Sequence, residues 1–583
     1  MKALCLVATV SIALWLGHFV GAATITVTNS ADSGTGSLRQ ALATAQNGDT
    51  IVFNLSLPAT ISLTSAELVI NASIGIIGPG PSLLTVARAQ NAPSFPIFRV
   101  TRDHTVVIQG MTMTNGSTGS GFGGAGIYND HSNLTLNNCA LINNAVDHRV
   151  SGGAITNNGE LSGSASLTIN NSILAGNSVA PSGTATFGGA IFNYGIHGSA
   201  TLIINNSTIS NNYAFQGGGL FNDGGVTGSS ATVTISNSTF TGNYADQYAG
   251  AIMNEGNEAG QARVTVSNST FAGNSSCNCN FFAGDIFNDG TREPGGATLE
   301  IGNSIFKGGL INPRNIFNQG GVVISHGYNV TNDAGVLNTD RGIGDFNAPT
   351  DQVNTEPMLD PAGLQNNGGP TQTIALLPGS PAINSGDPSA PSRDQRSYLR
   401  DGPPDRGAFE SGGTIASLTS VSRKTHGGAG TFDVDLPLSG AAGVECRSGG
   451  GNGDHQLIMT FATPVTLANA SVTSGVGNVS QTTIAGSQVT IDLTGVTNAQ
   501  QIELTLFGVS DGANMNNESI PMGVLLGDVN SNGAVNATDV GLTKSHIGEP
   551  VLGSNFRADV NANGDINASD VGVVKSRLGT GFP

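Results

Sequence analysis

The stretch GGAIFN, from Gly188 to Asn193, is one of seven copies of a short phrase that decides the fold. The aliphatic residues of successive copies lie about 28 to 36 residues apart, a spacing typical of stacked solenoids and of propeller blades. The other copies are GGAGIYN from Gly123, GGAITN from Gly152, GGGLFN from Gly217, AGAIMN from Ala249, AGDIFN from Ala283 and NIFN from Asn315. The chain is therefore predicted to be a repeat protein.

Each copy continues into a second phrase that alternates apolar and polar residues and ends in Asn. Examples are LTINN, from Leu167 to Asn171, and VTISN, from Val233 to Asn237. This alternation predicts short strands with one buried face. A third phrase places a further Asn in five repeats, at Asn144, Asn177, Asn212, Asn243 and Asn274. Each repeat thus offers about three short strands joined by corners, which favours a solenoid.

Coils of this shape stack in register, which puts identical side chains above one another at the ~4.8 Å strand spacing. An Asn at a corner tolerates left-handed backbone angles, and its amide can donate to one coil and accept from the next. We therefore expect an all-β fold, a right-handed parallel β-helix. On these repeats, Thr24 to about Glu410 resembles the secreted bacterial β-helix proteins of the pectin-lyase-like superfamily. The resemblance implies this fold and leaves the activity open.

The composition excludes several classes of partner. The chain has 583 residues and 83 glycines, and only 11% of its residues are charged. Its net charge of −18 argues against nucleic acids and anionic membrane surfaces, and cations are the more natural ligands. Residues 1–22 combine Lys2, an apolar run and a small-residue end, which predicts a signal peptide. No later segment is apolar enough to span a membrane, so we expect a secreted monomer, extracellular or attached to a cell surface.

Further segments follow from the same patterns. Residues 23–116 are predicted to be an N-terminal cap with the first coils, and residues 117–345 the β-helix repeats. Ser37 can cap a short helix that covers the open end of the first coil. Residues 413–525, with runs such as QVTIDL from Gln488, are predicted to be an antiparallel β-sandwich that acts as a spacer or binding module. His426 and His455, within it, are expected at the surface or in turns.

Residues 346–412 separate the repeats from the sandwich. DPAGLQNNGGPTQTIALLPGSPAINSG, from Asp360, and DRGAFE, from Asp405, resemble the terminal module of bacterial surface proteins called choice-of-anchor Q. The resemblance implies a C-terminal cap on the β-helix. Within it, we expect Asp394, Arg396, Asp405 and Arg406 to form a structural network of ion pairs and turns.

The last segment, 526–583, contains a duplicated 12-residue loop, DVNSNGAVNATD and DVNANGDINASD. Calcium needs six to eight hard oxygen ligands around a tight turn, for which Gly at loop position 6 allows the bend and position 7 gives a backbone carbonyl. Two calcium ions are therefore predicted. Their ligands are Asp528, Asn530, Asn532, the carbonyl of Ala534, Asn536 and Asp539 in the first loop, and Asp559, Asn561, Asn563, the carbonyl of Asp565, Asn567 and Asp570 in the second.

The paired loops, each followed by a helix pattern, resemble a type I dockerin, the calcium-dependent module that binds cohesin modules. Both loops have Asn at position 5, where such dockerins usually have Asp, so calcium affinity should be lowered. The resemblance implies a cohesin-type partner or a cell-surface scaffold. It places recognition on Ala537, Thr538, Lys544 and Ser545 in one copy and on Ala568, Ser569, Lys575 and Ser576 in the other. Because both copies carry Lys-Ser, docking in either of two orientations is a hypothesis.

The β-helix repeats leave catalysis open. Asp223, Glu255 and Asp289 follow the phrase Asn in three consecutive coils, either as carboxylates of a calcium-and-uronate site or as turn-forming acids. A lyase also needs a base, and the candidates are Arg149, Arg263 and Arg292. No paired-Asp motif for glycoside hydrolysis stands out. We expect a docked solenoid that binds glycan or protein rather than an enzyme; the alternative is a polysaccharide lyase or glycoside hydrolase acting on uronate-rich polysaccharide.

The cysteines do not form a disulfide framework. Cys139 replaces the Ser that follows the last Asn of the second phrase in most other coils, so we expect a buried thiol. Cys277 and Cys279 form a Cys-Asn-Cys, for which a local bridge and a metal clip are both open.

Overall fold

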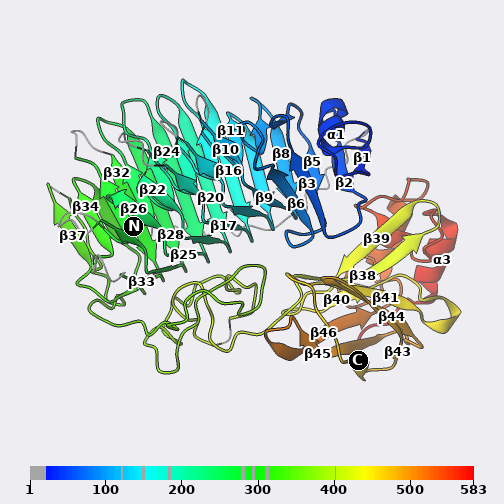
Figure 1. Ribbon diagram of the computed structural model, residues 1–583. Coiled ribbons are helices and arrows are strands. Elements are labelled where there is room, and N and C mark those ends of the chain that lie inside the picture. The colour runs from blue at the N-terminus through cyan, green and yellow to red at the C-terminus, as the bar shows by residue number, and fades with distance from the viewer. Residues whose placement is uncertain are drawn as a thin grey trace.

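The computed structural model describes residues 22–119, 123–147, 151–180, 186–277, 283–291, 296–308, 314–340, 342–400 and 402–583. Over these residues the chain forms a long parallel β-solenoid, a segment folded beside it, an antiparallel β-sandwich and a small helical C-terminal unit (Figure 1). The predicted fold class is confirmed. Apart from Ala22, the predicted signal peptide lies outside the described residues, and so do Arg149, Cys279 and Arg292.

Sheet 1 forms one full-length face of the solenoid, with all of its described strands parallel and in register. Apolar side chains such as Leu167 and Ile169 point inward between polar neighbours, as the alternation predicts. Its strands, in order of pairing, are β1 (Thr24–Val27), β2 (Thr50–Phe53), β5 (Gly75–Ile77), β8 (Thr105–Gln109), β12 (Asn133–Asn137), β16 (Ser164–Asn170), β20 (Ser199–Asn205), β24 (Ser230–Ser236), β28 (Gln261–Ser267), β32 (Ala297–Gly302) and β35 (Val322–Ser325).

Sheets 2 and 3 form the other two long faces. Sheet 2 contains β3 (Ala59–Leu63), β6 (Leu84–Arg88), β9 (Thr112–Thr114), β13 (Ala140–Ile142), β17 (Ile173–Ala175), β21 (Thr208–Ser210), β25 (Thr239–Thr241), β29 (Thr270–Ala272), β33 (Ile305–Lys307) and β36 (Val330–Thr331). Sheet 3 contains β4 (Leu68–Ile70), β7 (Phe98–Val100), β11 (Ile127–Asp130), β15 (Ile155–Asn158), β19 (Ile191–Tyr194), β23 (Leu220–Asp223), β27 (Ile252–Glu255), β31 (Ile286–Asp289), β34 (Ile316–Gln319) and β37 (Val336–Thr339).

Three strands are expected in each repeat. The structure has a fourth short strand in several coils, and these strands form a fourth, shorter sheet. Sheet 4 contains β10 (Ser117–Thr118), β14 (Ala145–Val146), β18 (Ser178–Val179), β22 (Tyr213–Gln216), β26 (Tyr244–Gln247) and β30 (Ser275–Ser276). Each of its described strands follows the third-phrase Asn or Gly of its coil. The sequence signal for these strands is weak because most are only two residues long.

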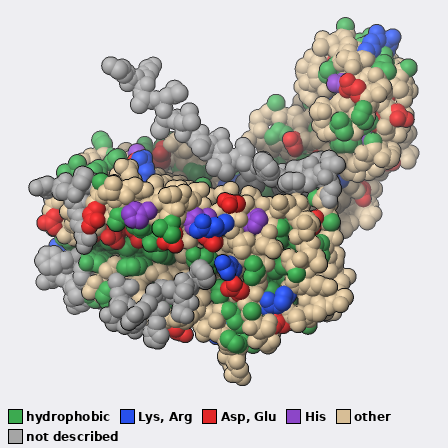
Figure 2. Space-filling view, turned by 90° about the horizontal axis from the view of Figure 1, so that it is seen from above, with side chains coloured by type: hydrophobic (Ala, Val, Ile, Leu, Met, Phe, Trp, Pro, Cys, Tyr) green, Lys and Arg blue, Asp and Glu red, His purple; other side chains and the backbone are tan. Residues whose placement is uncertain are grey.

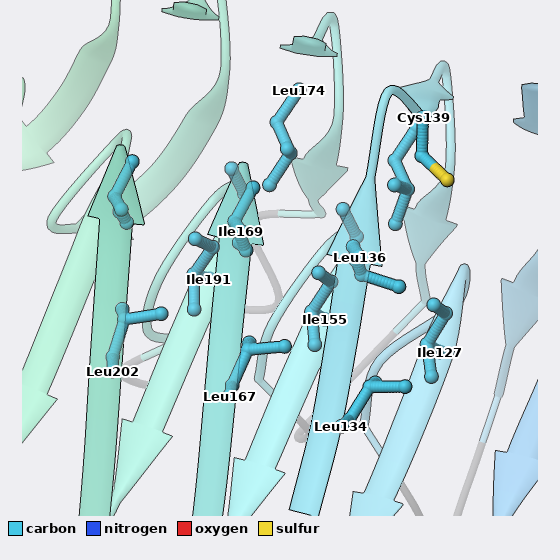
Figure 3. Packing of buried hydrophobic residues seen from close by; sticks show 14 of the residues in the cluster. Ile127, Leu134, Leu136, Cys139, Ile155, Leu167, Ile169, Leu174, Ile191 and Leu202 are labelled. Atoms are coloured by element: carbon cyan, nitrogen blue, oxygen red, sulfur yellow. The ribbon is translucent and has the colours of Figure 1, made fainter. Parts of the chain in front are cut away.

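Stacked aliphatic side chains fill the interior of the solenoid. Ile127, Ile155 and Ile191 lie in register on neighbouring strands of sheet 3, and Figure 3 shows them facing leucines and isoleucines from sheet 1. Cys139 also lies inside this core, and burial raises the pKa of its thiol to about 12. The expected buried thiol is therefore confirmed.

The third-phrase asparagines form a continuous ladder of side-chain amides. The Nδ2 of each one donates to the Oδ1 of the next at 2.9 to 3.0 Å, through Asn144, Asn177, Asn212, Asn243 and Asn274. The same Oδ1 atoms also accept the backbone N–H of the preceding coil. Every amide in this ladder is almost completely buried, so it cannot hydrogen-bond to water in place of its neighbour. The ladder therefore fixes the register in which the coils stack.

A second ladder runs through the asparagines of the seven first-phrase copies and ends at Asn338, in the coil after them. Its Nδ2 to Oδ1 distances are 2.7 to 2.8 Å, through Asn129, Asn157, Asn193, Asn222, Asn254, Asn288, Asn318 and Asn338. The left-handed backbone belongs to other asparagines, those that end the second phrase. Their φ angles are 44° to 50°, at Asn138, Asn171, Asn206, Asn237, Asn268 and Asn303. In most coils the laddering and turning roles expected of a single corner Asn are therefore divided between different positions. Asn303 combines them, since its backbone is left-handed and its Nδ2 donates to Oδ1 of Asn268 at 2.7 Å.

The N-terminal end is closed by the expected short helix, α1 (Leu38–Thr44). Ser37 is its N-cap and accepts a hydrogen bond from the backbone N–H of Gln40 at 3.3 Å. Leu38 and Leu42 pack into the solenoid core, so the helix covers the interior that the first coil would otherwise expose (Figure 1).

Residues 346–412 differ from the expected end cap in their position. Only the beginning of the segment lies at the solenoid end, where Phe346 packs on Phe306 with ring centroids 5.7 Å apart. The rest lies beside sheet 2 (Figure 1), where Gln395 contacts Thr208 and Thr239 through hydrogen bonds of 2.8 and 2.6 Å. Sheet 2 presents a row of hydroxyls on its outer face, those of Thr208, Thr239 and Thr270, and each of them is hydrogen-bonded to the folded-back segment.

The predicted polar network of this segment is confirmed. Asp394 accepts a hydrogen bond from Arg396 Nε at 2.8 Å, and both side chains are buried. Asp405 accepts backbone N–H groups. Arg406 donates to the carbonyl of Asn329 in the solenoid at 2.7 Å. These contacts attach the segment to the coils.

The C-terminal third contains two sheets, two α-helices and two 3-10 helices. One sheet has the order β39 (Gly430–Asp435), β38 (Thr419–His426), β41 (His455–Thr460), β44 (Gln488–Thr494) and β43 (Asn478–Ala485). The other has the order β40 (Gly443–Glu445), β46 (Met515–Val524), β45 (Gln500–Ser510) and β42 (Asn469–Ser474). The remaining elements are the 3-10 helices η1 (Gly450–Asn452) and η2 (Phe556–Ala558), and the helices α2 (Ala537–Ser545) and α3 (Ala568–Ser576).

The ladder of third-phrase asparagines ends on an acid, Asp285. Asn274 donates to its Oδ1 at 2.8 Å, while its Oδ2 is buried without a hydrogen-bond partner among the described residues. Burial raises the pKa of Asp285 well above its ordinary value because the ionised form loses its hydration. The pKa of Asp285 is higher in the folded chain than in the unfolded chain. Its contribution to the free energy of unfolding is therefore complete at low pH and is lost as pH rises.

We therefore expect Asp285→Asn to stabilise the protein at pH 8 by about 1–3 kcal/mol, because an amide keeps the hydrogen bond from Asn274 without a buried charge. Chemical denaturation at pH 4 and pH 8 measures the effect, and the gain should shrink at the lower pH. Asn243→Asp is the matched control, which places an acid inside the ladder and should destabilise at pH 8. A variant Asp285→Asn less stable than wild type at pH 8 would contradict this account.

Candidate calcium and partner-binding site

The first C-terminal loop is closed by its own polar side chains. Asp528 accepts the backbone N–H groups of Asn532 and Gly533 on its two oxygens, at 3.0 and 2.9 Å. Asn530 Oδ1 also accepts from the N–H of Asn532, and Asn532 Oδ1 accepts from that of Ala534, both at 3.0 Å. The oxygens at loop positions 1, 3 and 5 thus curl around one turn, as a calcium loop requires.

The loop ends at the start of α2. Asn536 is the N-cap, and its side chain accepts the N–H of Thr538 at 2.8 Å. Asp539 completes a capping box by accepting the N–H of Asn536 at 2.9 Å, and its other oxygen accepts the N–H of Asn530 at 3.2 Å. The Asp539 carboxylate, at loop position 12, is therefore held by backbone N–H groups from the start of the loop, at Asn530, and from its end, at Asn536.

The second loop repeats this geometry. Asp559 accepts the N–H groups of Asn563 and Gly564 at 3.1 and 2.9 Å. Asn561 accepts from the N–H of Asn563 at 3.0 Å, and Asp570 accepts from that of Asn561 at 3.2 Å. Asn567 caps α3, and Asn563 Oδ1 accepts from the N–H of Asp565.

The residues present fit a calcium ion in each loop. Each loop contains two carboxylates with no exposed surface, Asp528 with Asp539 and Asp559 with Asp570. Burial and the neighbouring carboxylate raise the pKa of Asp528 and of Asp570, because each ionised group loses hydration and faces a second negative charge. A bound calcium ion would supply the opposite charge. Within the described ranges, no group of three His, Cys, Asp or Glu residues meets the geometry of a metal site, since the predicted loops use Asn oxygens for the remaining positions.

Reciprocal contacts give the two repeats an internal two-fold relation. Gly548 donates its N–H to the carbonyl of Ile566 at 3.0 Å, and the equivalent Gly579 donates to that of Val535 at 2.9 Å. All eight predicted recognition residues are exposed, in equivalent places on α2, α3 and their loops. They are Ala537, Thr538, Lys544, Ser545, Ala568, Ser569, Lys575 and Ser576.

Residues 526–579 match the sequence family described as Dockerin type I domain. The C-terminal unit is a type I dockerin. Type I dockerins generally bind calcium, and a dockerin implies docking to a cohesin partner. Proteins with dockerins are typically extracellular or at the cell surface. No curated protein matches the chain. In the described ranges, every helix is too short or too polar to cross a bilayer.

The dockerin follows the sandwich without a linker. Only Leu525, Leu526 and Gly527 separate the end of β46 from the first calcium loop, whereas the loop of an EF-hand follows a helix. Leu525 donates its N–H to the carbonyl of Glu445, and Gly527 donates to that of Cys446, both at 3.0 Å. The sequence signalled only that a helix pattern was missing before the first loop; the contacts themselves needed the tertiary structure.

The predicted acidic row lies on the outer face of sheet 3. Asp223, Glu255 and Asp289 are in register on β23, β27 and β31. Asp223 and Asp289 each accept a backbone N–H two residues later, at 3.1 and 3.0 Å, and Asn257 donates to Glu255 at 3.0 Å and to Asp289 at 3.3 Å. Burial and the charge of Glu255 raise the pKa of Asp223 to about 7. These are the contacts of acids that close turns.

The candidate bases are not assembled beside this row in the described chain. Arg263 lies on β28 of sheet 1 and pairs with Glu300 of β32. Arg149 and Arg292 lie outside the described residues. On the described surface seen from above, most acidic, basic and His side chains of the solenoid lie in one band, with the three kinds intermixed (Figure 2).

His426, expected at the surface or in a turn, is completely buried. It ends β38 and contacts Asp559 of the second calcium loop, with Nδ1 2.9 Å from Oδ2. His455 is also buried, and desolvation lowers its pKa to about 4. A lone His in a strand pattern carries no signal that distant loops will cover it, so sequence reasoning missed both.

Removal of one calcium-ligand carboxylate should remove one ion. We expect Asp539→Ala in the full-length mature protein to reduce calcium stoichiometry from two ions to one, measured by isothermal titration calorimetry. The loss follows because the loop then has a single carboxylate to balance the ion. The control is Thr538→Ala, an exposed neighbour that ligates nothing, which should retain two ions. Two ions bound by Asp539→Ala would show that this loop holds its cation in another way.

Proposed function

We propose that this is a secreted, calcium-binding display protein that attaches through its dockerin to a cohesin-type partner and presents its solenoid as a binding surface for glycan or protein. The observation that carries the proposal is the exposure of both recognition faces of a calcium-loop pair. Each face has the same Lys-Ser pair at the end of its helix. The glycan or protein that the solenoid binds would then be held close to the cohesin-type partner.

The two-fold relation of the repeats supports docking in either orientation. Lys544 and Lys575 both lie in the last turn of their helices, and both are exposed. A partner surface that accepts one Lys-Ser pair would meet nearly the same pattern after the dockerin is turned by half a revolution. Two equivalent modes protect binding against the loss of either face.

The solenoid faces support display more than catalysis. In the described chain the carboxylates of sheet 3 are engaged by turn N–H groups and by Asn257, and the described candidate base, Arg263, is paired on another sheet. Long, flat, repetitive faces of this kind suit binding to extended ligands.

The second candidate is a polysaccharide lyase or glycoside hydrolase acting on uronate-rich polysaccharide. The in-register carboxylates of Asp223, Glu255 and Asp289 favour it, because three like charges in a row attract a cation that could in turn hold a uronate. The raised pKa of Asp223 is consistent with either reading, since it follows from burial beside Glu255.

The two docking modes can be separated by charge reversal. We expect Lys544→Glu and Lys575→Glu each to retain binding to a type I cohesin that recognises the wild type, because the opposite face remains intact. The double variant should lose binding by at least about tenfold, measured by surface plasmon resonance with calcium present. If only one of the single variants lost binding strongly, the dockerin would have a single docking mode. Binding by the double variant at wild-type strength would refute this face as the partner site.

Display and catalysis can be separated with the full-length mature protein. We expect no new reducing ends and no rise in absorbance at 235 nm on a panel of uronate-rich and neutral polysaccharides, with and without calcium, while binding to one of the immobilised polysaccharides or to a surface protein is retained. The matched control is the triple variant Asp223→Asn, Glu255→Gln and Asp289→Asn, which keeps the shape of the row and removes its charge. Cleavage by wild type that disappears in the triple variant would establish the enzyme instead.

A further inference from the structure

The β-sandwich and the dockerin share one hydrophobic core. Val444 of the sandwich is buried among dockerin residues that include Val529 and Val560. Phe432 of the sandwich stacks on Phe556 of the dockerin, with ring centroids 5.4 Å apart and planes 6° from parallel. This half-buried aromatic stack helps to fix the relative position of the two parts.

At the centre of this interface, His426 reaches from the sandwich to the first ligand of the second calcium loop. Its Nδ1 lies 2.9 Å from Oδ2 of Asp559, and neither side chain is exposed. Its Nε2 lies 3.2 Å from Nη1 of Arg447. A guanidinium has no acceptor, so Nε2 must accept that hydrogen bond. Nδ1 therefore carries the proton and donates to Asp559.

Arg447 is itself immobilised. Glu445 accepts hydrogen bonds from its Nε and Nη2 at 2.8 and 2.7 Å, and both side chains are fully buried. The Arg447 guanidinium holds the pKa of Glu445 down to about 2, against the opposing effect of burial. A chain of buried contacts thus runs from Glu445 through Arg447 and His426 to the Asp559 carboxylate.

The backbone of the sandwich also touches the second loop. Ser448 donates its N–H to the carbonyl of Val560 at 2.7 Å. Gly427 lies so close to the loop that a Cβ there would be 2.1 Å from the carbonyl oxygen of Asn563, whereas a Cβ on Gly428 would meet nothing within 4 Å. In the hairpin turn after β38, Gly427 therefore packs closely against the second calcium loop, whereas Gly428 has open space around it.

The first loop receives a different kind of support. The hydrogen bonds to the Asp528 carboxylate come from its own loop, from Asn532 and Gly533. Arg557 approaches this loop only through backbone carbonyls, donating to those of Asp528 and Val529 at 3.1 and 2.9 Å. Two loops with nearly identical sequences thus stand in different surroundings, because the sandwich supplies a side-chain donor to one of them.

We propose that the β-sandwich acts as the outer coordination shell of the second calcium loop, with His426 as a positioning residue that orients the Asp559 carboxylate toward the cation. The proposal rests on the assignment of calcium to the dockerin. Groups that orient a metal ligand raise metal affinity by about ten- to hundredfold. The two sites are therefore unequal: the loop of Asp559 binds calcium more tightly and keeps its shape at calcium concentrations that leave the loop of Asp528 empty. The same contacts hold the dockerin at a fixed angle to the rest of the protein.

The test measures calcium chloride binding by isothermal titration calorimetry on the full-length mature protein, with one loop disabled at a time. In the Asp539→Ala background only the second loop binds, and His426→Leu should weaken that binding by about ten- to hundredfold. His426→Asn, whose amide can donate from nearly the position of Nδ1, should restore most of the affinity. In the Asp570→Ala background only the first loop binds, and His426→Leu should change its affinity less than twofold.

The glycine pair gives an independent measurement that leaves His426 in place. Gly427→Ala, which meets the Asn563 carbonyl, should weaken calcium binding at the second loop in the Asp539→Ala background, and Gly428→Ala should not. Thermal melting in excess chelator separates positioning from a merely structural effect, because a positioning residue lowers the rise in melting temperature that calcium produces.

Three results would overturn the proposal. They are unchanged second-loop affinity in His426→Leu, equal weakening of both loops, and a loss of melting temperature that is the same with calcium and with chelator. A protein in which neither loop binds calcium would instead refute the calcium assignment of the proposed function.

Discussion

Hydrogen bonds between identical side-chain amides in neighbouring coils hold the solenoid together. Two ladders of buried Asn, one through Asn212 and one through Asn222, join successive coils at 2.7 to 3.0 Å. A buried amide without its partner costs about 1–3 kcal/mol, so a slip of register along the ladder would multiply that cost. The ladders therefore set the alignment in which the aliphatic core, the sheets and the outer rows of side chains all fall.

The outer rows that this alignment creates serve different purposes. On sheet 2, hydroxyls in register bind the folded-back segment 346–412 through Gln395 and its neighbours. On sheet 3, register brings Asp223, Glu255 and Asp289 together, where turn N–H groups and Asn257 accommodate them. Repetition thus produces attachment on one face and a line of acids on another, which is why the acids alone do not indicate a reaction.

The segments outside the coils are joined by buried polar contacts rather than by flexible linkers. Tyr398 of the folded-back segment contacts Asp511 of the sandwich, and the sandwich continues through β46 into the dockerin. A dockerin joined in this way holds the exposed Lys544 and Lys575, the proposed recognition residues, in a defined direction. Under the proposed function, attachment and display would be parts of one arrangement, in which the partner surface sets how the solenoid faces its surroundings.

The sequence by itself determined the coils, the cap helix after Ser37 and the two dockerin loops, because each depends on contacts that repeat at a fixed spacing or lie within a dozen residues. Phrase periodicity gave the strands, and the loop oxygens from Asp528 to Asp539 lie on one short turn. Tertiary structure alone decided where residues 346–412 pack, which asparagines ladder and which turn, and that His426 is buried against Asp559. Those contacts join residues that are far apart in the chain, and the sequence around each residue carries no signal for its partner. Their pairing depends on how the folded surfaces pack against one another.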